Sequence, residues 1–127
     1  MKYIDISGEW VNEYGSLMRI LGVDVLTGQF YGTYESTTGA SGKYRVVGLT
    51  DTQPDYSIDS QTIAFSVSWR DMGGTPTDAN WVSAFSGQIQ ILQNQEIMTT
   101  TYLLQKNTDP QNNWESTIVD KATFTRK

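Results

Sequence analysis

The sequence predicts an all-β domain, and three observations support this class. Val, Ile and Thr together contribute 33 residues while Ala and Leu contribute 12, a bias that favours extended strands over helices. Apolar and polar residues alternate with period two in segment after segment. Clusters of Gly, Asn, Asp, Thr and Pro separate these segments. We therefore expect antiparallel strands joined in the order of the sequence.

Eight segments fit the strand pattern. The expected strands are 8–14, 16–23, 29–36, 43–50, 62–70, 80–91, 96–105 and 114–126. The chain of 127 residues is sized for one domain, which we take as 1–127. An open sheet would leave two hydrogen-bonding edges, and closing the sheet removes them. We therefore expect an eight-stranded antiparallel up-and-down β-barrel, whose interior either fills with side chains or holds one small ligand.

Composition excludes several classes of function. The chain has no cysteine and no histidine, which removes disulfides, thiolate nucleophiles, Cys-type zinc sites and the commonest general base. Its 14 carboxylates show no paired placement on one inward face, so no enzymatic activity, metal or cofactor is expected. The net charge of -5 argues against a nucleic-acid partner, and no window approaches the ~20 apolar residues of a membrane span.

Alternation also predicts which side chains point into the barrel. The inward sets are Trp10, Asn12, Tyr14 and Ser16; Phe30, Gly32, Tyr34 and Ser36; Ile63, Phe65, Val67 and Trp69; Trp81, Ser83, Phe85, Gly87, Ile89 and Ile91; and Met98, Thr100, Tyr102 and Leu104. A buried hydroxyl or amide without a partner costs ~1–3 kcal/mol, so a barrel built only for packing would use aliphatic residues instead. Two interpretations stay open. The polar groups either lie at barrel ends, in water or paired with one another, or they line an aromatic-walled cavity for a small molecule.

Six stretches, in order and with compatible spacing, carry a resemblance to a known family. They are residues 6–16, 26–36, 65–69, 85–88, 102–104, and 114–119 followed by 123–125. Together they span essentially the whole chain, and they resemble the strands of the avidin and streptavidin family of biotin-binding proteins. The resemblance implies a barrel that binds and sequesters the vitamin biotin without catalysis. It also implies a secreted mature protein from which a signal has been removed, while the absence of cysteine leaves the compartment open and the cytoplasm stays an alternative.

The resemblance implies a role for each polar candidate. Asn12, Ser16 and Tyr34 would donate hydrogen bonds to the ureido oxygen of biotin, which stabilises negative charge there as an oxyanion hole does. Ser36 would accept a hydrogen bond from one ureido N–H, and the hydroxyl of Ser83 would contact the ligand sulfur.

The other implied contacts are apolar or come from the backbone. Trp69, Phe85 and Tyr102 would form aromatic walls, and Leu104 belongs to the same ligand-binding set. The backbone N–H of Ala40, in a lid loop at 37–42, would bind the valerate carboxylate. Trp114 would close the pocket of a neighbouring subunit, which implies a homotetramer.

A few positions depart from the family pattern. Phe85 and Tyr102 stand where the family has Trp, and the hydroxyl of Tyr102 needs a partner of its own. Ala122 stands where the family has an Asp or Asn that accepts from the second ureido N–H, and its side chain can accept nothing. Asp120 has the same parity but lies about 6.6 Å further along the strand. Trp81 replaces a small hydroxyl residue near the carboxylate end, where it would cover the mouth or obstruct it.

Biotin binding weaker than that of the tightest family members is the resulting hypothesis. One alternative is an avidin-like carrier of a different small molecule, such as one that lacks the second N–H. The other is a drifted barrel with little affinity for biotin. The joint presence of Asn12, Ser16, Tyr34 and Ser36 argues against drift, because none of them helps a dry core.

Overall fold

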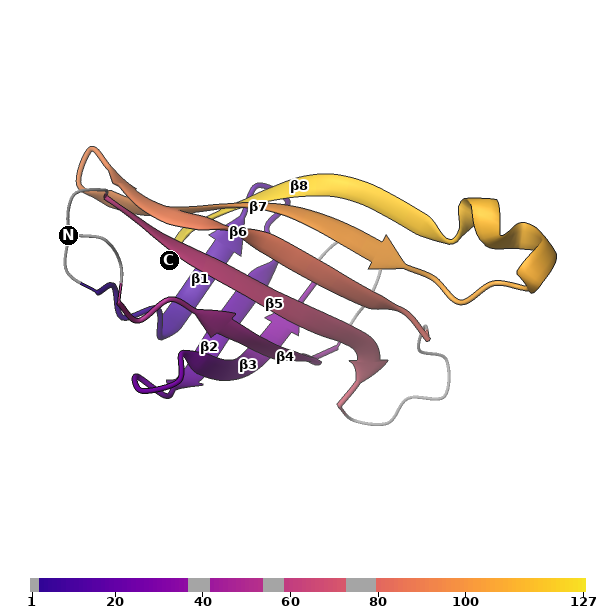
Figure 1. Cartoon of the computed structure of the whole chain (residues 1–127), viewed down its shortest axis with the longest axis horizontal. Helices are drawn as coiled ribbons and strands as arrows, with labels where there is room; N and C mark the ends of the chain where they lie inside the picture. Colours follow the sequence, from indigo (N-terminus) through magenta and orange to yellow (C-terminus); the bar gives the residue numbers. More distant parts are fainter. Residues whose placement is uncertain (1–2, 37–41, 54–58, 73–79) are drawn as a thin grey trace.

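A closed barrel of eight antiparallel strands makes up the fold (Figure 1). The computed structural model describes residues 3–36, 42–53, 59–72 and 80–127, apart from the Asp71 side chain. The strands are β1 (Gly8–Asn12), β2 (Leu17–Val23), β3 (Gln29–Glu35), β4 (Tyr44–Thr50), β5 (Ser60–Asp71), β6 (Val82–Leu92), β7 (Gln95–Gln105) and β8 (Thr117–Arg126), with the 3-10 helix η1 (Pro110–Glu115) before β8. Each strand pairs with the next, and β1 pairs with β8. The expected up-and-down barrel is confirmed.

Most strand boundaries differ from the expected ones by one to three residues, and two of these differences have clear local reasons. The first strand was expected to reach residue 14 but ends at Asn12, because the backbone turns there: Gly15 N donates to Asn12 O at 3.0 Å, and Gly15 has a φ of 82°. The last strand was expected from residue 114 but begins at Thr117. Pro110 stands in the first turn of η1, where its fixed φ and missing N–H are tolerated, and this helix holds Trp114 outside the sheet.

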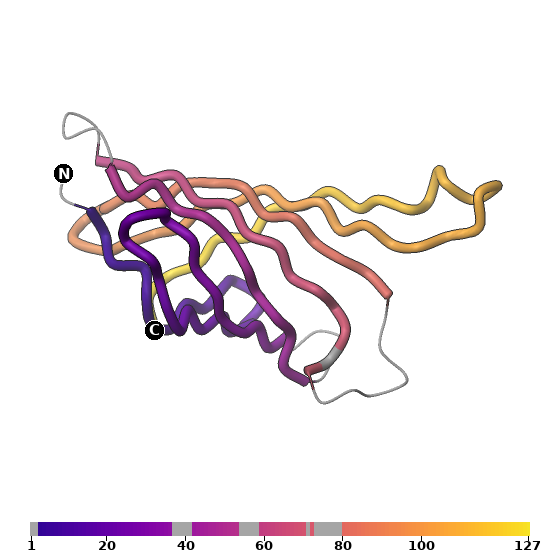
Figure 2. The backbone as a smooth tube through the Cα atoms, turned by 60° about the horizontal axis from the view of Figure 1, so that its bottom comes forward, coloured from indigo at the N-terminus to yellow at the C-terminus, as the bar shows by residue number. Residues whose placement is uncertain are grey.

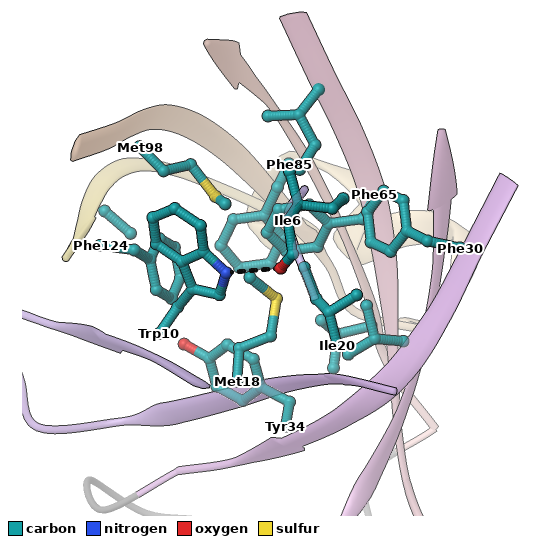
Figure 3. Close-up of a cluster of buried hydrophobic side chains, with 14 of the residues drawn as sticks. Ile6, Trp10, Met18, Ile20, Phe30, Tyr34, Phe65, Phe85, Met98 and Phe124 are labelled. Carbon is teal, nitrogen blue, oxygen red and sulfur yellow. Dashed lines mark hydrogen bonds between the residues drawn. The ribbon is translucent and has the colours of Figure 1, made fainter. Parts of the chain in front are cut away.

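The core of the barrel is made of aromatic and aliphatic side chains from the inward faces. The largest fully buried side chains include Trp10, Phe30, Phe124, Ile6, Met18 and Met98 (Figure 3). Tyr44 and Ile89 are equally buried. Phe65 and Phe85, from neighbouring strands, stack at the centre of this cluster with ring centroids 4.6 Å apart. Gly32 takes an inward position where a Cβ would collide with the carbonyl oxygen of Arg19 on β2.

Three residues expected to point inward are exposed instead. Tyr14 lies in the turn after β1, Trp81 lies just before β6, and Ile91 lies near the end of β6. The alternation is correct for the middle of each strand, but it was extended past the strand ends at Tyr14 and Trp81 and to the hairpin end of β6 at Ile91. The first and last residues of a strand therefore leave the core even when they share its parity.

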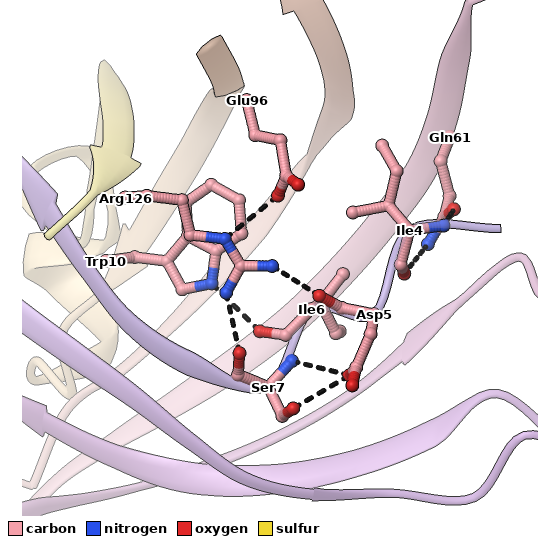
Figure 4. A network of polar contacts seen from close by, with 8 residues as sticks. All are labelled: Ile4, Asp5, Ile6, Ser7, Trp10, Gln61, Glu96 and Arg126. Carbon is pink, nitrogen blue, oxygen red and sulfur yellow. Dashed lines mark hydrogen bonds and ion pairs between the residues drawn. The ribbon is translucent and has the colours of Figure 1, made fainter. Parts of the chain in front are cut away.

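The segment before β1 closes one end of the barrel (Figure 4). The side-chain amide of Gln61 pairs with the backbone of Ile4, accepting from its N–H at 2.8 Å and donating to its carbonyl at 3.1 Å. The indole of Trp10 donates to the Ile6 carbonyl at 2.9 Å, and the guanidinium of Arg126 lies 4.2 Å from the centre of the Trp10 ring. The candidate site lies at the opposite end of the barrel, where β5 and β7 finish.

The β7–β8 hairpin extends beyond the other strands (Figure 2). Its strands pair from Ile97 with Thr125 to Gln105 with Thr117, and η1 forms the tip. None of the helices that the structure describes has the length and apolar character needed to cross a membrane.

Candidate functional site

The turn that follows β1 builds one wall of the site. Asn12 Oδ1 accepts hydrogen bonds from the backbone N–H groups of Tyr14 at 3.0 Å and Ser16 at 2.9 Å, which is the local pattern that makes Asn favourable in turns. Its amide nitrogen then donates across the barrel to the hydroxyl of Tyr34 at 3.1 Å. Asn12, Ser16 and Tyr34 are all buried. The structure thus brings these three predicted residues together.

Tyr34 keeps its proton in this environment. Burial raises the pKa of Tyr34 to about 12, while side-chain hydrogen bonds with Ser16 and Asn12 act in the opposite direction. The nearby Tyr102 and Glu13 add to the rise in the pKa, because a negative charge on the phenol would be repelled. At neutral pH the Tyr34 hydroxyl is therefore a hydrogen-bond donor and acceptor.

An aromatic wall continues from Tyr34 around the barrel. The Trp69 ring packs edge-on against Tyr34 with centroids 5.4 Å apart, and Phe85 and Tyr102 pack with centroids 4.9 Å apart. The indole N–H of Trp69 donates to the Ser83 hydroxyl at 2.8 Å. Because that hydroxyl accepts from the indole, its own hydrogen is left to be donated into the barrel.

The other candidates lie around this wall or apart from it. Ser36 is half-buried one residue after β3, and Leu104 is half-buried directly opposite Ser83. Trp114 is 81% exposed on η1, so the site of its own chain does not include it. Ala40 lies outside the described residues.

The positions that depart from the family pattern lie close to these residues. Ala122 is buried opposite Thr100, and the Thr100 hydroxyl donates to the Ala122 carbonyl at 2.7 Å. Asp120 is exposed and lies opposite Tyr102. The Trp81 side chain lies at the rim, where the Lys106 ammonium is 5.7 Å from its ring centre. Trp81 therefore does not fill the buried part of the barrel.

Sequence reasoning missed two residues at the site. Tyr44 is buried at the start of β4, with its ring centroid 5.1 Å from that of Trp69, and its alternation with Val46 could have placed it inward. Glu13 was not a candidate either. Both of its carboxylate oxygens lie 3.0 Å from the backbone nitrogen of Thr123, and no sequence pattern predicts this contact.

The arrangement suits a ligand whose buried part is uncharged, with an acceptor at one end and a flat apolar body. Among the described residues, the buried polar side chains are Asn12, Ser16, Thr50, Gln61, Ser83 and Thr100, and all are uncharged. Hydroxyl and amide donors converge near Tyr34, while aromatic rings cover the adjacent surface. Such a combination is usual for small-molecule sites.

A comparison with models of protein families bears on this arrangement. The model described as the Avidin family matches residues 1–127, the full length of the chain. The match therefore includes every strand that positions a candidate site residue.

Proposed function

The chain belongs to the avidin family, and from this premise we propose that it binds biotin in the barrel interior without transforming it. The observation that supports the proposal most strongly is the buried hydrogen-bonded group of Asn12, Ser16 and Tyr34. A packed barrel gains nothing from three polar residues at this position, whereas a ligand oxygen would receive hydrogen bonds from them.

The ureido group of biotin fits this end of the site. Its oxygen would accept from the Asn12 amide and from the hydroxyls of Ser16 and Tyr34, and one ureido N–H would donate to Ser36. The Tyr34 hydroxyl now accepts from Asn12 at 3.1 Å, so ligand binding would redirect an existing donor instead of desolvating a new one. Preorganised donors of this kind cost little reorganisation when the ligand arrives.

The ring system and tail of biotin would lie against the aromatic wall. Trp69, Phe85 and Tyr102 offer flat surfaces in contact with the buried core, and the Ser83 hydroxyl can donate to the ligand sulfur. Affinity below the family's tightest members is expected, because Ala122 offers no side-chain acceptor for the second ureido N–H.

Calorimetric titration with biotin tests the proposal. Tyr34→Phe keeps the ring and removes the hydroxyl, so it should weaken binding by roughly 5- to 150-fold, the equivalent of ~1–3 kcal/mol for an unpaired buried group. Tyr31→Phe is the matched control, because Tyr31 is exposed on β3, and it should change the affinity less than twofold. An absence of heat and of tryptophan fluorescence change with millimolar biotin would refute biotin as the ligand.

A carrier of a different small molecule is the second candidate. The buried, apolar Ala122 favours a ligand with one N–H in place of two. A biotin analogue methylated on the ureido nitrogen that faces away from Ser36 distinguishes the two candidates. Tighter binding of this analogue than of biotin would favour the second function.

A further inference from the structure

We propose that Glu13 supplies the acceptor that Ala122 lacks, so that the second ureido N–H of biotin donates to the Glu13 carboxylate. This inference rests on the proposed biotin binding and assigns a specificity-determining residue within it. The carboxylate would then come from the turn after β1 instead of from β8.

The position of the Glu13 carboxylate is the first argument. β1 ends at Asn12, which pairs with Phe124. The part of β8 from Thr123 back to Thr117, on the side of η1, therefore extends beyond the end of β1. Glu13 Oε1 and Oε2 each lie 3.0 Å from the backbone nitrogen of Thr123, whose N–H donates to the carboxylate. Thr123 follows Ala122 directly in the chain, so the carboxylate is held at the backbone beside the position that lacks an acceptor.

The electrostatic surroundings are the second argument. Burial is the main cause that raises the pKa of Tyr34 and of Tyr102. The negative charge of Glu13 adds to the rise in both pKa values, although for Tyr102 the effect of Asp120 is larger. These two hydroxyls belong to the wall of the site. A charge felt by both hydroxyls lies within electrostatic range of the site, although the Glu13 side chain itself is exposed.

The chemistry of the carboxylate is the third argument. An ionised carboxylate has about four lone-pair positions, so sharing one N–H of Thr123 leaves capacity for a ligand N–H. Charge-assisted hydrogen bonds are also stronger than neutral ones.

Two neighbouring groups fit the role less well. Asp120 lies opposite Tyr102, one inward position nearer the hairpin tip than Ala122, and its Oδ1 accepts from the N–H of Lys121 at 2.7 Å. The Thr100 hydroxyl lies opposite Ala122 but is a neutral acceptor, and its hydrogen is donated to the Ala122 carbonyl.

Calorimetry with biotin and with the methylated analogue tests the inference. Glu13→Ala should weaken biotin binding by roughly 5- to 50-fold, and Glu13→Gln by less, because a neutral amide oxygen is a weaker acceptor. Neither variant should change the affinity for the analogue by more than twofold, since the analogue has no N–H to donate there. Asp120→Ala is the matched control and should leave biotin binding within twofold of the wild type.

A second substitution distinguishes a contact of Glu13 with the ligand from a purely structural role of Glu13 between β1 and β8. In the Glu13→Ala background, Ala122→Asp should restore at least part of the lost affinity for biotin. In the wild-type background the same change should give little gain, because the two carboxylates would repel each other. Recovery of affinity in the first background together with little gain in the second supports the inference.

The outcomes distinguish the inference from the proposed function. If the wild type gives no heat with biotin, the proposed function fails and the inference fails with it. If the wild type binds biotin but Glu13→Ala binds it as tightly, or loses affinity for biotin and the analogue equally, the inference alone is overturned. Loss of binding in Asp120→Ala instead of Glu13→Ala would also overturn it.

Discussion

At the scale of single residues, Tyr34 takes part in both the polar and the aromatic contacts of the site. It is 4% exposed, it accepts a hydrogen bond from Asn12, and its ring packs against Trp69, Phe85 and Phe124. Its position on β3 places it between the polar turn after β1 and the aromatic wall. The same burial that makes its hydroxyl a useful ligand donor also ties the protein's stability to the protonation of that hydroxyl.

The raised pKa of Tyr34 predicts how stability changes at alkaline pH. The folded-state pKa of about 12 exceeds the ordinary tyrosine pKa of 10.0, so the folded state binds more protons than the unfolded state between these values. The stabilisation is fully present below about pH 10 and is lost as the pH rises through about 12. Denaturant unfolding from pH 8 to 12 should show a decline that is smaller in Tyr34→Phe by about 1–3 kcal/mol. Identical pH profiles for the two proteins would contradict this account.

Single residues also show how far sequence reasoning reached. The grouping of Asn12, Ser16 and Tyr34 follows from strand parity and the family pattern, and the structure brings these residues together. The position of Glu13 was not predicted, because turn residues follow no fixed alternation. Its carboxylate contacts the Thr123 backbone only because of the path that the chain takes after Asn12. A long side chain can cross a seam between strands that are far apart in the sequence, and the sequence pattern contains no signal of that kind.

At the scale of strands, one cation reinforces the backbone pairing between β1 and β8. Arg126, the last residue of β8, stacks on Trp10 of β1 and forms an ion pair with Glu96 of β7, with N and O atoms 2.9 Å apart. It also donates to the carbonyl of Ser7 at 2.6 Å and to the carbonyl of Asp5 (Figure 4). The final strand, the first strand and the segment before it are therefore joined through one guanidinium.

This arrangement predicts that arginine cannot be replaced by lysine at position 126. A lysine ammonium keeps the charge but lacks the planar fork that stacks on indole and donates in several directions. Arg126→Lys should lower the free energy of unfolding by about 1–3 kcal/mol in urea titrations. Arg45→Lys, on an exposed position of β4, is the matched control and should change it by less than about 0.5 kcal/mol. A loss in Arg126→Lys no larger than the control's would refute the role of the guanidinium.

Strand alternation predicted the middle of each element well and its ends poorly. The inward positions Ile63, Phe65 and Val67 of β5 are buried as expected. Trp114 was assigned to the last strand, yet it lies on η1, because the segment from Pro110 favours a helical turn before pairing with β7 can begin. Alternation records which face a residue takes once it is in the sheet, whereas pairing partners decide where the sheet stops.

The whole molecule has two unlike ends. One end is closed by the segment before β1, with Gln61 holding the backbone of Ile4. At the other end the candidate site lies between the turn after β1, the ends of β5 and β7, and the start of β6. The β7–β8 hairpin extends past that end and carries Trp114 at its tip (Figure 1).

The exposed Trp114 predicts an oligomer in which this hairpin meets a second copy of the chain. A tryptophan that is 81% exposed on a projecting hairpin gains apolar burial only from another molecule, and closed symmetric assemblies are the usual way for a chain to provide it. By the family resemblance we expect a homotetramer in which Trp114 would reach the site of a neighbour. Light scattering at micromolar concentration should then give the mass of four chains, and a monomeric mass would contradict it.

Trp114→Ala should leave the barrel folded, weaken the subunit contact and reduce biotin affinity by roughly 10-fold or more, as expected when a buried aromatic anchor is removed from an interface. The exposed Tyr31→Phe serves as the control. If Trp114→Ala kept both the mass and the affinity of the wild type, the hairpin would have no part in a neighbour's site.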